Sequence, residues 1–496
     1  MRSLQELEKL AGLSIYPASV QQSVGGVTYA IGRRDIEKFI VAVGEDCGVE
    51  GRQVDRSPQG CVCIGELSAA NARAVRNALP WTAPRCLGLR ASVGLGDRLG
   101  LATPGHIRAL RGAGLAGVLA QQSIREMTRT RRTPQQVLDA ATWGVLQEGF
   151  DEGFGADADH LQQPEDVDYT AQAGFKLFTL DPGALVDNLA DTLDDLALRQ
   201  AFERLDFSGL DVEIDRYAGL YAGRKFKLAD GQKLHLDEEA FFRAAVKYGN
   251  AIAQVARMAR RVAQAAGGDS ELEISVDETD SPTTPAEHCF FAAELKRLGV
   301  KWVSLAPRFI GRFEKGVDYL GDPRQFRRDF ARHVAVMQTL GPYKLSIHSG
   351  SDKFSIYPII AELAGPYVHL KTSGTSYLEA LRAVAQIEPG LFRDILEHAR
   401  RRYPYDKASY HVSAQPEKVP LAEELRDEEL PGVLALLDGR QMLHVTFGSV
   451  MTAAGADGAP PLGERILLAL RTQEERHYQA LQRHIARHLA SFARTG

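Results

Sequence analysis

The chain has 496 residues, of which 44% are hydrophobic and 25% charged, so it can bury a sizeable core. The formal net charge is −5, with acidic and basic residues interspersed, which excludes the basic surface of a nucleic-acid-binding protein and the polybasic patch of a membrane-surface protein. The sequence contains neither a signal peptide nor an apolar run of the roughly 20 residues that cross a membrane, and we therefore expect a cytoplasmic protein.

The first 84 residues differ in pattern from the rest of the chain. Short runs typical of β-strands occur at residues 26–31, 39–43 and 61–64, and helical patterning separates or follows them. We predict a small α/β N-terminal region over residues 1–84, with its boundary between Pro80 and Pro84.

From residue 85 onward, short apolar runs alternate with polar turns and amphipathic helical stretches, a pattern typical of parallel βα units. The candidate strands are residues 87–93, 117–121, 154–160, 175–180, 272–278, 302–307, 344–348 and 367–372. Eight such units close a barrel. The predicted fold is therefore α/β, a (β/α)8 TIM barrel over residues 85–405, with the N-terminal α/β extension and a C-terminal helical extension.

The gap between the fourth and fifth strands is longer than the others. It contains a polar segment, residues 224–236, in which Asp230-Gly231 is a hairpin turn signal. We predict an insertion near residues 205–245 that covers the barrel mouth, followed by a long helix over 239–266. After the eighth strand we expect helices over 377–386 and 389–402. Residues 406–496 form a C-terminal extension packed on the barrel, with an extended piece at 408–414 and a polar helix over 462–494 across the outside.

Polar residues lie at or just after the ends of most predicted strands, where barrel enzymes carry their catalytic groups. They include Asp97, Arg98, Gln121, Asp157, Asp159, His160, Asp277, Glu278, Arg308, His348, Asp352, Lys353, His369 and Lys371. Because all strand ends converge on one mouth, we expect these side chains to meet there. Strand alternation places Asp157 and Asp159 on one face, and His160 faces away from them unless it belongs to the turn.

The histidines among these residues indicate a metal site. His160 and His348, together with Glu278 or His369, would form a nitrogen and oxygen site that suits a divalent Zn, Mn, Co, Ni or Fe cation better than Mg or Ca. His411 is a competing ligand beyond the eighth strand. An open coordination position would let a substrate carbonyl or hydroxyl bind and be polarised.

The remaining polar residues suggest roles in binding a small polar substrate, and we expect a sugar acid. Arg308 could bind a carboxylate in bidentate fashion, and Lys371 could play a similar part. Asp159 and Glu278 are candidates for general acid and base. The candidates for substrate binding are Asp97, Arg98, Gln121, Arg308, Asp352, Lys353 and Lys371. The glycine-rich run at 94–100 has the wrong last spacing for a dinucleotide loop, and Walker A, HExxH and GxSxG motifs are absent from the sequence.

Five runs of this sequence are similar to the tagaturonate/fructuronate epimerase family, which the chain resembles from about residue 85 to 450. They are residues 96–106, 155–160, 275–279, 344–353 and 369–377. The resemblance implies a divalent-metal-dependent barrel enzyme that interconverts D-tagaturonate and D-fructuronate by inverting C4, in hexuronate catabolism. It implies Asp159 and Glu278 as the proton-handling pair, and His160, His348 and His369 as metal ligands.

Inversion at C4 of a 2-ketohexuronate leaves several routes open, since C4 is adjacent to neither the ketone nor the carboxylate. Retro-aldol cleavage of C3–C4 is physically easier than direct deprotonation, and the missing dinucleotide loop counts against transient oxidation by a nicotinamide. Two other functions remain as alternatives: a metal-dependent barrel isomerase or aldolase with another ketose or sugar acid, and a non-catalytic sugar-binding barrel. We expect a small-molecule partner only, with no nucleic acid and no membrane, and a homo-oligomer stays open.

Overall fold

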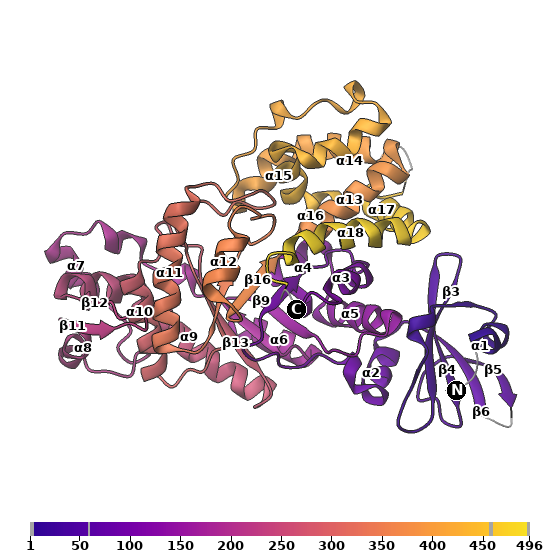
Figure 1. Ribbon diagram of the computed structural model, residues 1–496, viewed down its shortest axis with the longest axis horizontal. Helices are drawn as coiled ribbons and strands as arrows, with labels where there is room; N and C mark the ends of the chain where they lie inside the picture. Colours follow the sequence, from indigo (N-terminus) through magenta and orange to yellow (C-terminus); the bar gives the residue numbers. More distant parts are fainter. Residues whose placement is uncertain (1–3, 58–59, 456–459, 494–496) are drawn as a thin grey trace.

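The structure is a computed structural model that describes residues 4–57, 60–455 and 460–493. A barrel occupies the middle, an N-terminal sheet lies at one end, and a layer of C-terminal helices covers one side of the barrel (Figure 1). Within the described ranges, no helix is both long enough and apolar enough to span a membrane.

The N-terminal part is an antiparallel sheet with two apolar faces. Its strands are β1 (Ser14–Ile15), β2 (Gln21–Gln22), β3 (Thr28–Arg34), β4 (Glu37–Gly44), β5 (Arg52–Ser57) and β6 (Gly60–Glu66), flanked by helices α1 (Leu4–Ala11) and α2 (Ala69–Ala78). Alternation along β4 places Ile40 and Ala42 in one cluster with Trp143 of the barrel, and Val41 and Val43 in another with α1. The sheet is therefore attached to the barrel through the face that carries Ile40 and Ala42.

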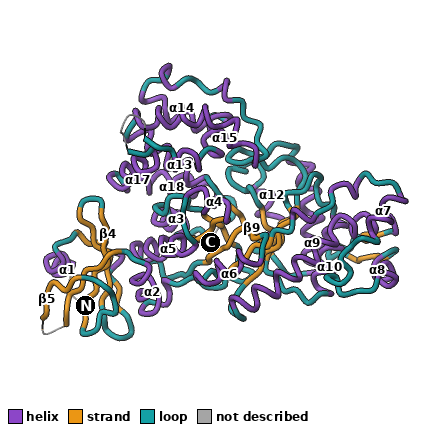
Figure 2. Tube along the Cα trace, turned by 180° about the vertical axis from the view of Figure 1, so that it is seen from behind, coloured by secondary structure: helices purple, strands orange, loops and turns teal. Residues whose placement is uncertain are grey.

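Eight parallel strands form a closed barrel, as the sequence predicted. They are β7 (Ser92–Leu95), β8 (Ala116–Ser123), β9 (Gly155–Leu161), β10 (Leu177–Leu180), β13 (Glu271–Val276), β14 (Ser304–Pro307), β15 (Lys344–Ile347) and β16 (Val368–Thr372). The first strand begins later than predicted, because the backbone N–H groups of Leu87 and Gly88 donate to the carboxylate of Glu271 and form a turn there. The barrel strands are visible at the centre of Figure 2.

A ring of eight helices surrounds the barrel. Seven follow their strands in order: α3 (Thr103–Leu110), α5 (Pro134–Glu148), α6 (Pro164–Ala173), α9 (Glu238–Ala266), α10 (Pro285–Arg297), α11 (Pro323–Leu340) and α12 (Tyr357–Ala364). The eighth position is taken by α18 (Glu474–Leu489), which packs along α3, contacts Tyr357 of α12 through His488, and buries Ile485 in the barrel core. The C-terminal helix thus completes the ring.

This arrangement corrects the predicted single polar helix over 462–494. The segment forms two helices, α17 (Leu462–Thr472) and α18, and α18 is amphipathic, with His477, His484 and His488 buried on its inner face. The extended piece predicted at 408–414 forms no strand within the described residues: a 3-10 turn covers Lys407–Ser409, and residues 410–413 then run along the barrel mouth.

The helix after the eighth strand, α13 (Thr375–Ile387), belongs to a separate layer with its own apolar core. The other helices of this layer are α14 (Pro389–Asp406), α15 (Leu437–Val445), α16 (Phe447–Thr452) and α17. A short helix, α4 (Ile124–Thr130), follows β8 and contacts α16. The layer lies beside the barrel (Figure 1), and His444 of α15 lines the site described below.

The insertion after the fourth strand contains α7 (Asp195–Phe202), α8 (Ile214–Tyr221) and the hairpin of β11 (Arg224–Lys227) and β12 (Lys233–Leu236). The predicted cover over the mouth is wrong. The hairpin contacts α9 and α10 on the outside of the ring, at the edge of the molecule farthest from the N-terminal sheet (Figures 1 and 2). Its buried Phe226, Leu234 and Leu236 need an apolar surface, which the helices provide and the polar mouth does not.

Candidate active site

The C-terminal ends of the barrel strands open into two adjoining hollows that share Lys315, His348, Ser349 and Tyr410. The outer cavity has a volume of about 390 Å³ and lies between the ends of β13 and β14 and residues 410–413. The inner hollow is smaller, about 30 Å³, and reaches down to the ends of β8, β9 and β16. A small molecule entering the outer cavity therefore meets the strand ends.

Lys371 on β16 is the centre of the charge network below the mouth. Its Nζ lies 2.6 Å from Asp159 Oδ1, 2.8 Å from Asp157 Oδ2 and 2.7 Å from Glu273 Oε1, and it donates to Thr179 Oγ1 at 2.7 Å. All of these side chains are buried. Three carboxylates thus share one ammonium group, whose positive charge offsets part of their mutual repulsion.

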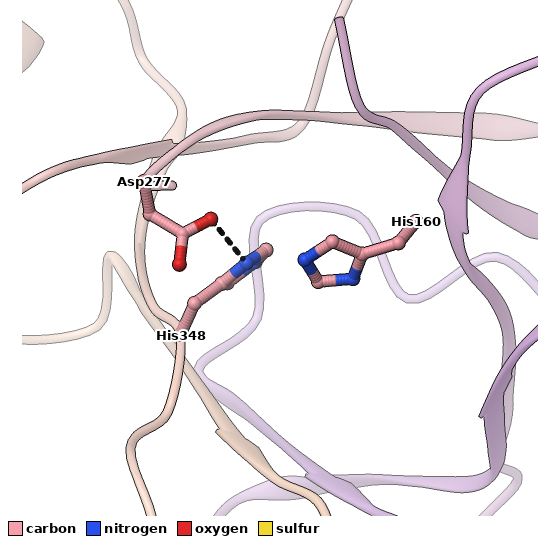
Figure 3. Close-up of side chains that lie close together, drawn as sticks. All are labelled: His160, Asp277 and His348. Carbon is pink, nitrogen blue, oxygen red and sulfur yellow. Dashed lines mark hydrogen bonds and ion pairs between the residues drawn. The ribbon is translucent and has the colours of Figure 1, made fainter. Parts of the chain in front are cut away.

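Asp159 and His160 are neighbours in sequence, yet both point into the mouth. His160 has a left-handed φ of 55°, and the register of β9 against β10 shifts between Phe178 and Leu180. This irregularity breaks the strand alternation that would turn His160 away from Asp159. The carboxylate of Asp159 lies 2.7 Å from Nδ1 of His160, so the other ring nitrogen is directed at His348 (Figure 3).

His348, directly after β15, lies between two carboxylates, those of Glu273 on β13 and of Asp277 directly after it. Its Nε2 lies 2.7 Å from Glu273 Oε1, and its Nδ1 lies 3.1 Å from Asp277 Oδ1. The rings of His160 and His348 have centroids 5.1 Å apart. Three strands, β9, β13 and β15, therefore bring two imidazoles and one carboxylate to the same point (Figure 3).

The charged neighbours in this network, of both signs, shift the pKa values of its members. Burial alone would raise the pKa of Asp159, but His160 and Lys371 bring it well below its usual range. Burial disfavours the charged form of His160, yet Asp159 raises the pKa of His160 to about 10. The pKa of His348 is also raised against the effect of burial, mainly by Asp277. The site therefore attracts positive charge to both imidazoles.

Ligand atoms of His160, Asp277 and His348 lie within 4.8 Å of one another. Two imidazoles and a carboxylate on one side, with the other side open to the cavity, match the donor set of non-haem iron and related transition metals. Metal-binding histidines commonly donate their other ring nitrogen to a carboxylate, and Asp159 lies in that position at Nδ1 of His160. The residues present thus fit a divalent cation.

His369, the third predicted ligand, lies in a different group. Ligand atoms of His369, Asp157 and Glu273 cluster inside the barrel, and Ser92 Oγ lies 2.9 Å from Nδ1 of His369. Burial lowers the pKa of His369 to about 3. The three predicted histidines are therefore not gathered at one point, and Asp277 stands with His160 and His348 where His369 was expected.

The other predicted residues divide between the two hollows. Arg98, Gln121, Asp159 and Lys371 line the inner hollow. Glu278, Arg308 and His411 line the outer cavity, where Glu278 and His411 are exposed. His411 thus faces the substrate side rather than the pair of histidines.

Three predicted substrate-binding residues have structural partners instead. The carboxylate of Asp97 accepts backbone N–H groups of Leu99, Gly100 and Ala102. Asp352 pairs with Arg440 and His484 at the contact with the C-terminal helices. Lys353 donates to the carbonyl groups of Glu314, Val317 and Ser351. None of the three lines either hollow, because their polar atoms are committed to the loops that they fasten.

A third group of possible ligand atoms, Asp352, His484 and His488, is also structural. Nε2 of His488 accepts the backbone N–H of Asp352, and its Nδ1 lies 3.0 Å from the carbonyl oxygen of His484. Both ring nitrogens of His488 are therefore used within the protein, and the group joins α18 to the loop after β15.

The sequence analysis did not include Glu273 in the site, because Glu273 lies in the middle of its strand and the candidates came from the strand ends. The signal was present in the alternation of Glu271, Glu273, Ser275 and Asp277, which places polar side chains at every second position and therefore on one face. Lys315 and Tyr410 were missed because they come from segments outside the strands, whose approach to the mouth depends on tertiary structure.

A closed eight-stranded barrel with histidines and carboxylates at the C-terminal strand ends defines a barrel enzyme. Comparison with known proteins gives the family: the model of tagaturonate epimerase matches residues 16–492. The chain belongs to the tagaturonate epimerase family and is an isomerase, as the sequence resemblance predicted.

Two relatives are similar over nearly the whole chain. The tagaturonate/fructuronate epimerase of Thermotoga maritima is 40% identical over 480 residues, which cover 96% of each protein. Crystal structures of fructuronate-tagaturonate epimerase from Cohnella laeviribosi, native and with glycerol, are 36% identical, cover 98% of both chains and superpose with a TM-score of 0.91. The predicted barrel fold is thus confirmed by the topology and by this similarity.

Proposed function

We propose that this chain is a metal-dependent epimerase that interconverts D-tagaturonate and D-fructuronate by inversion at C4, in hexuronate catabolism. The observation that carries the proposal is the convergence of His160, Asp277 and His348 beside Lys371 and Asp159, in a chain of the tagaturonate epimerase family. A divalent cation bound by His160, Asp277 and His348 would supply a Lewis acid for the oxygen of the substrate's C2 carbonyl.

A positively charged side chain in the outer cavity supports a sugar acid as the substrate. Arg308 lines the outer cavity, and its guanidinium makes no hydrogen bond or ion pair with the described residues. A guanidinium binds a carboxylate through two parallel hydrogen bonds. Arg308 would therefore hold the C6 carboxylate and place the other end of the substrate toward the strand ends.

Asp159 and Glu278 stand on different sides of a substrate that spans both hollows, because Asp159 lines the inner one and Glu278 the outer one. In the retro-aldol route, a carboxylate takes the proton of the C4 hydroxyl, and C4 becomes an aldehyde. The C3–C4 bond breaks with its electron pair passing to C3, which gives an enediolate. After rotation of the aldehyde, C3 attacks its other face, and the proton returns to the C4 oxygen.

The test begins with metal analysis of the purified protein and an assay with D-fructuronate, with and without chelator. We expect turnover to D-tagaturonate that stops on complete metal removal and returns on adding back Zn, Mn, Co, Ni or Fe. Turnover that survives complete removal refutes the metal dependence, and an inactive metal-loaded protein refutes the function. Running the reaction in deuterated water separates the routes, since deuterium arriving at C4 rules out pure retro-aldol cleavage.

A further inference from the structure

Gln121 has an unusual position in the inner hollow. It lies on β8, is 1% exposed, and lines the hollow together with Asp159, His160, His348 and Lys371. Neither its Oε1 nor its Nε2 has a hydrogen-bond partner among the described residues. Its neighbour Gln122 does not line the hollow, and its Nε2 donates to Glu126. The amide of Gln121 thus has two N–H donors and one oxygen acceptor that are unused.

The hydrogen-bonding capacity of a buried amide that no protein group satisfies remains available to a molecule in the hollow. The charged groups around it are already engaged with one another, as the contacts of Lys371 and Asp159 illustrate. The amide of Gln121 is therefore a neutral group of the hollow that can accept and donate at once.

The backbone opposite makes room for this amide. Gly94 lies on the neighbouring strand β7, and a Cβ at this position would stand 1.5 Å from Oε1 of Gln121 and 2.7 Å from its Cδ. Gly94 does not have the positive φ that requires glycine. Its lack of a side chain thus serves the space that the amide of Gln121 occupies.

We propose that Gln121 is a specificity-determining residue whose amide binds the hydroxyl groups of the substrate next to the reacting carbon, and that Gly94 keeps the amide in place. A hydroxyl group both donates and accepts, so neighbouring hydroxyls on a sugar chain match the Oε1 and Nε2 of one amide. An enzyme site built to hydrogen-bond a hydroxyl rejects analogues that lack it, because its own buried groups are then left unpaired. This inference rests on the proposed function.

The first test compares activity with stability in Gln121→Met, which keeps the length of the side chain and removes its hydrogen bonds. We expect kcat/KM for D-fructuronate to fall about 100-fold, while the midpoint of urea unfolding stays equal or rises, because an unpaired polar group has been removed. A residue with only a structural role would lower the midpoint together with the activity. Gln232→Met, on the exposed hairpin, is the matched control and should change neither.

The second test is a double-mutant cycle. Gly94→Ala retains the amide but displaces it, and we expect kcat/KM to fall at least about 10-fold. In the Gln121→Ala background the added methyl group meets no amide, so Gly94→Ala should have little further effect. The 3-deoxy and 5-deoxy analogues should bind less tightly than the substrate to the wild type. To Gln121→Met they should bind as tightly as the substrate does.

The two ideas fail in different ways. If the wild type turns over neither uronate, the proposed function is wrong, and the stability change of Gln121→Met still reports on the unpaired amide. If the wild type is active but Gln121→Met keeps kcat/KM within about threefold, or if additive effects appear in the cycle, the assignment of Gln121 is overturned.

Discussion

The ammonium group of Lys371 stands among three buried carboxylates, and its own pKa is raised well above the ordinary value although burial opposes its charge. A buried carboxylate cluster that loses its cation is strongly destabilised, because repulsion is then no longer offset. Lys371 thus holds the polar interior of the barrel together as well as lining the inner hollow.

Replacing Lys371 by methionine should therefore lower the free energy of unfolding by about 3–5 kcal/mol at pH 7. Urea unfolding measures this directly. Lys176→Met removes the exposed ion pair with Asp269 and should cost less than about 1 kcal/mol. Equal losses in the two variants would contradict the role of Lys371 as the centre of the network.

Arg308 is the residue that should separate sugar acids from neutral sugars. Arg308→Met should raise KM for D-fructuronate about 100-fold, because the carboxylate loses a bidentate partner. The activity toward a neutral ketose such as tagatose, where measurable, should change little. Steady-state kinetics with both substrates checks this, with the exposed Arg324→Met as control. An equal effect on both substrates would place the carboxylate elsewhere.

At the scale of elements, α18 is joined to the barrel loop after β15 through Asp352. The Asp352 carboxylate faces Arg440 of α15 and His484 and His488 of α18, and it accepts a hydrogen bond from Thr375. Burial would raise the pKa of Asp352, but Arg440 and His484 hold it below its usual range. Its contribution to stability is therefore fully present above the ordinary aspartate pKa of about 4 and is lost as the pH falls toward the lower folded value.

Asp352→Asn should consequently lose about 3 kcal/mol of unfolding free energy at neutral pH, and the difference from the wild type should shrink below about pH 4. The urea midpoint between pH 7 and pH 3 measures both effects. The control is Asp394→Asn, which breaks an exposed pair with Arg465. A constant difference across the pH range would show that charge is not the cause.

How far the sequence predicts the elements follows from what each signal depends on. The barrel strands and the helix over 239–266 carry local hydrophobic periodicity, and the structure confirms them. The position of the hairpin at 224–236 does not follow from its own residues, since it depends on which apolar surface it finds. His160 and His348 could be predicted at the mouth, because each follows from the local pattern of its strand. The separation of His369 from them depends on how deep each side chain lies within the barrel, which no local pattern gives.

At the scale of the whole molecule, the candidate ligands link strands that are far apart in sequence: His160 on β9, Asp277 after β13 and His348 after β15. A ligand that binds only the folded state stabilises it in proportion to the logarithm of its concentration. Metal binding here would therefore stabilise the barrel as a unit.

We expect chelation to lower the melting temperature of the wild type by several degrees. Each kcal/mol of lost binding free energy should lower it by about 2–4 °C, or somewhat less in a chain of this size. Scanning fluorimetry with and without chelator measures the shift. His348→Ala should lose the response, and His235→Ala, on the exposed side of the hairpin, should retain it. A wild-type protein that does not respond to chelation would argue against a metal at this point.

The late position of α18 has a consequence for biosynthesis. Glu474 follows the last barrel strand, which ends at Thr372, by about 100 residues. All eight strands therefore emerge from the ribosome well before α18, which covers the flank between α12 and α3, has been made. During that interval the nascent barrel exposes an apolar flank, the kind of surface on which incomplete chains aggregate or recruit chaperones. Stalled or prematurely terminated chains should accordingly collect in the insoluble fraction, even when every residue of the catalytic mouth has been translated.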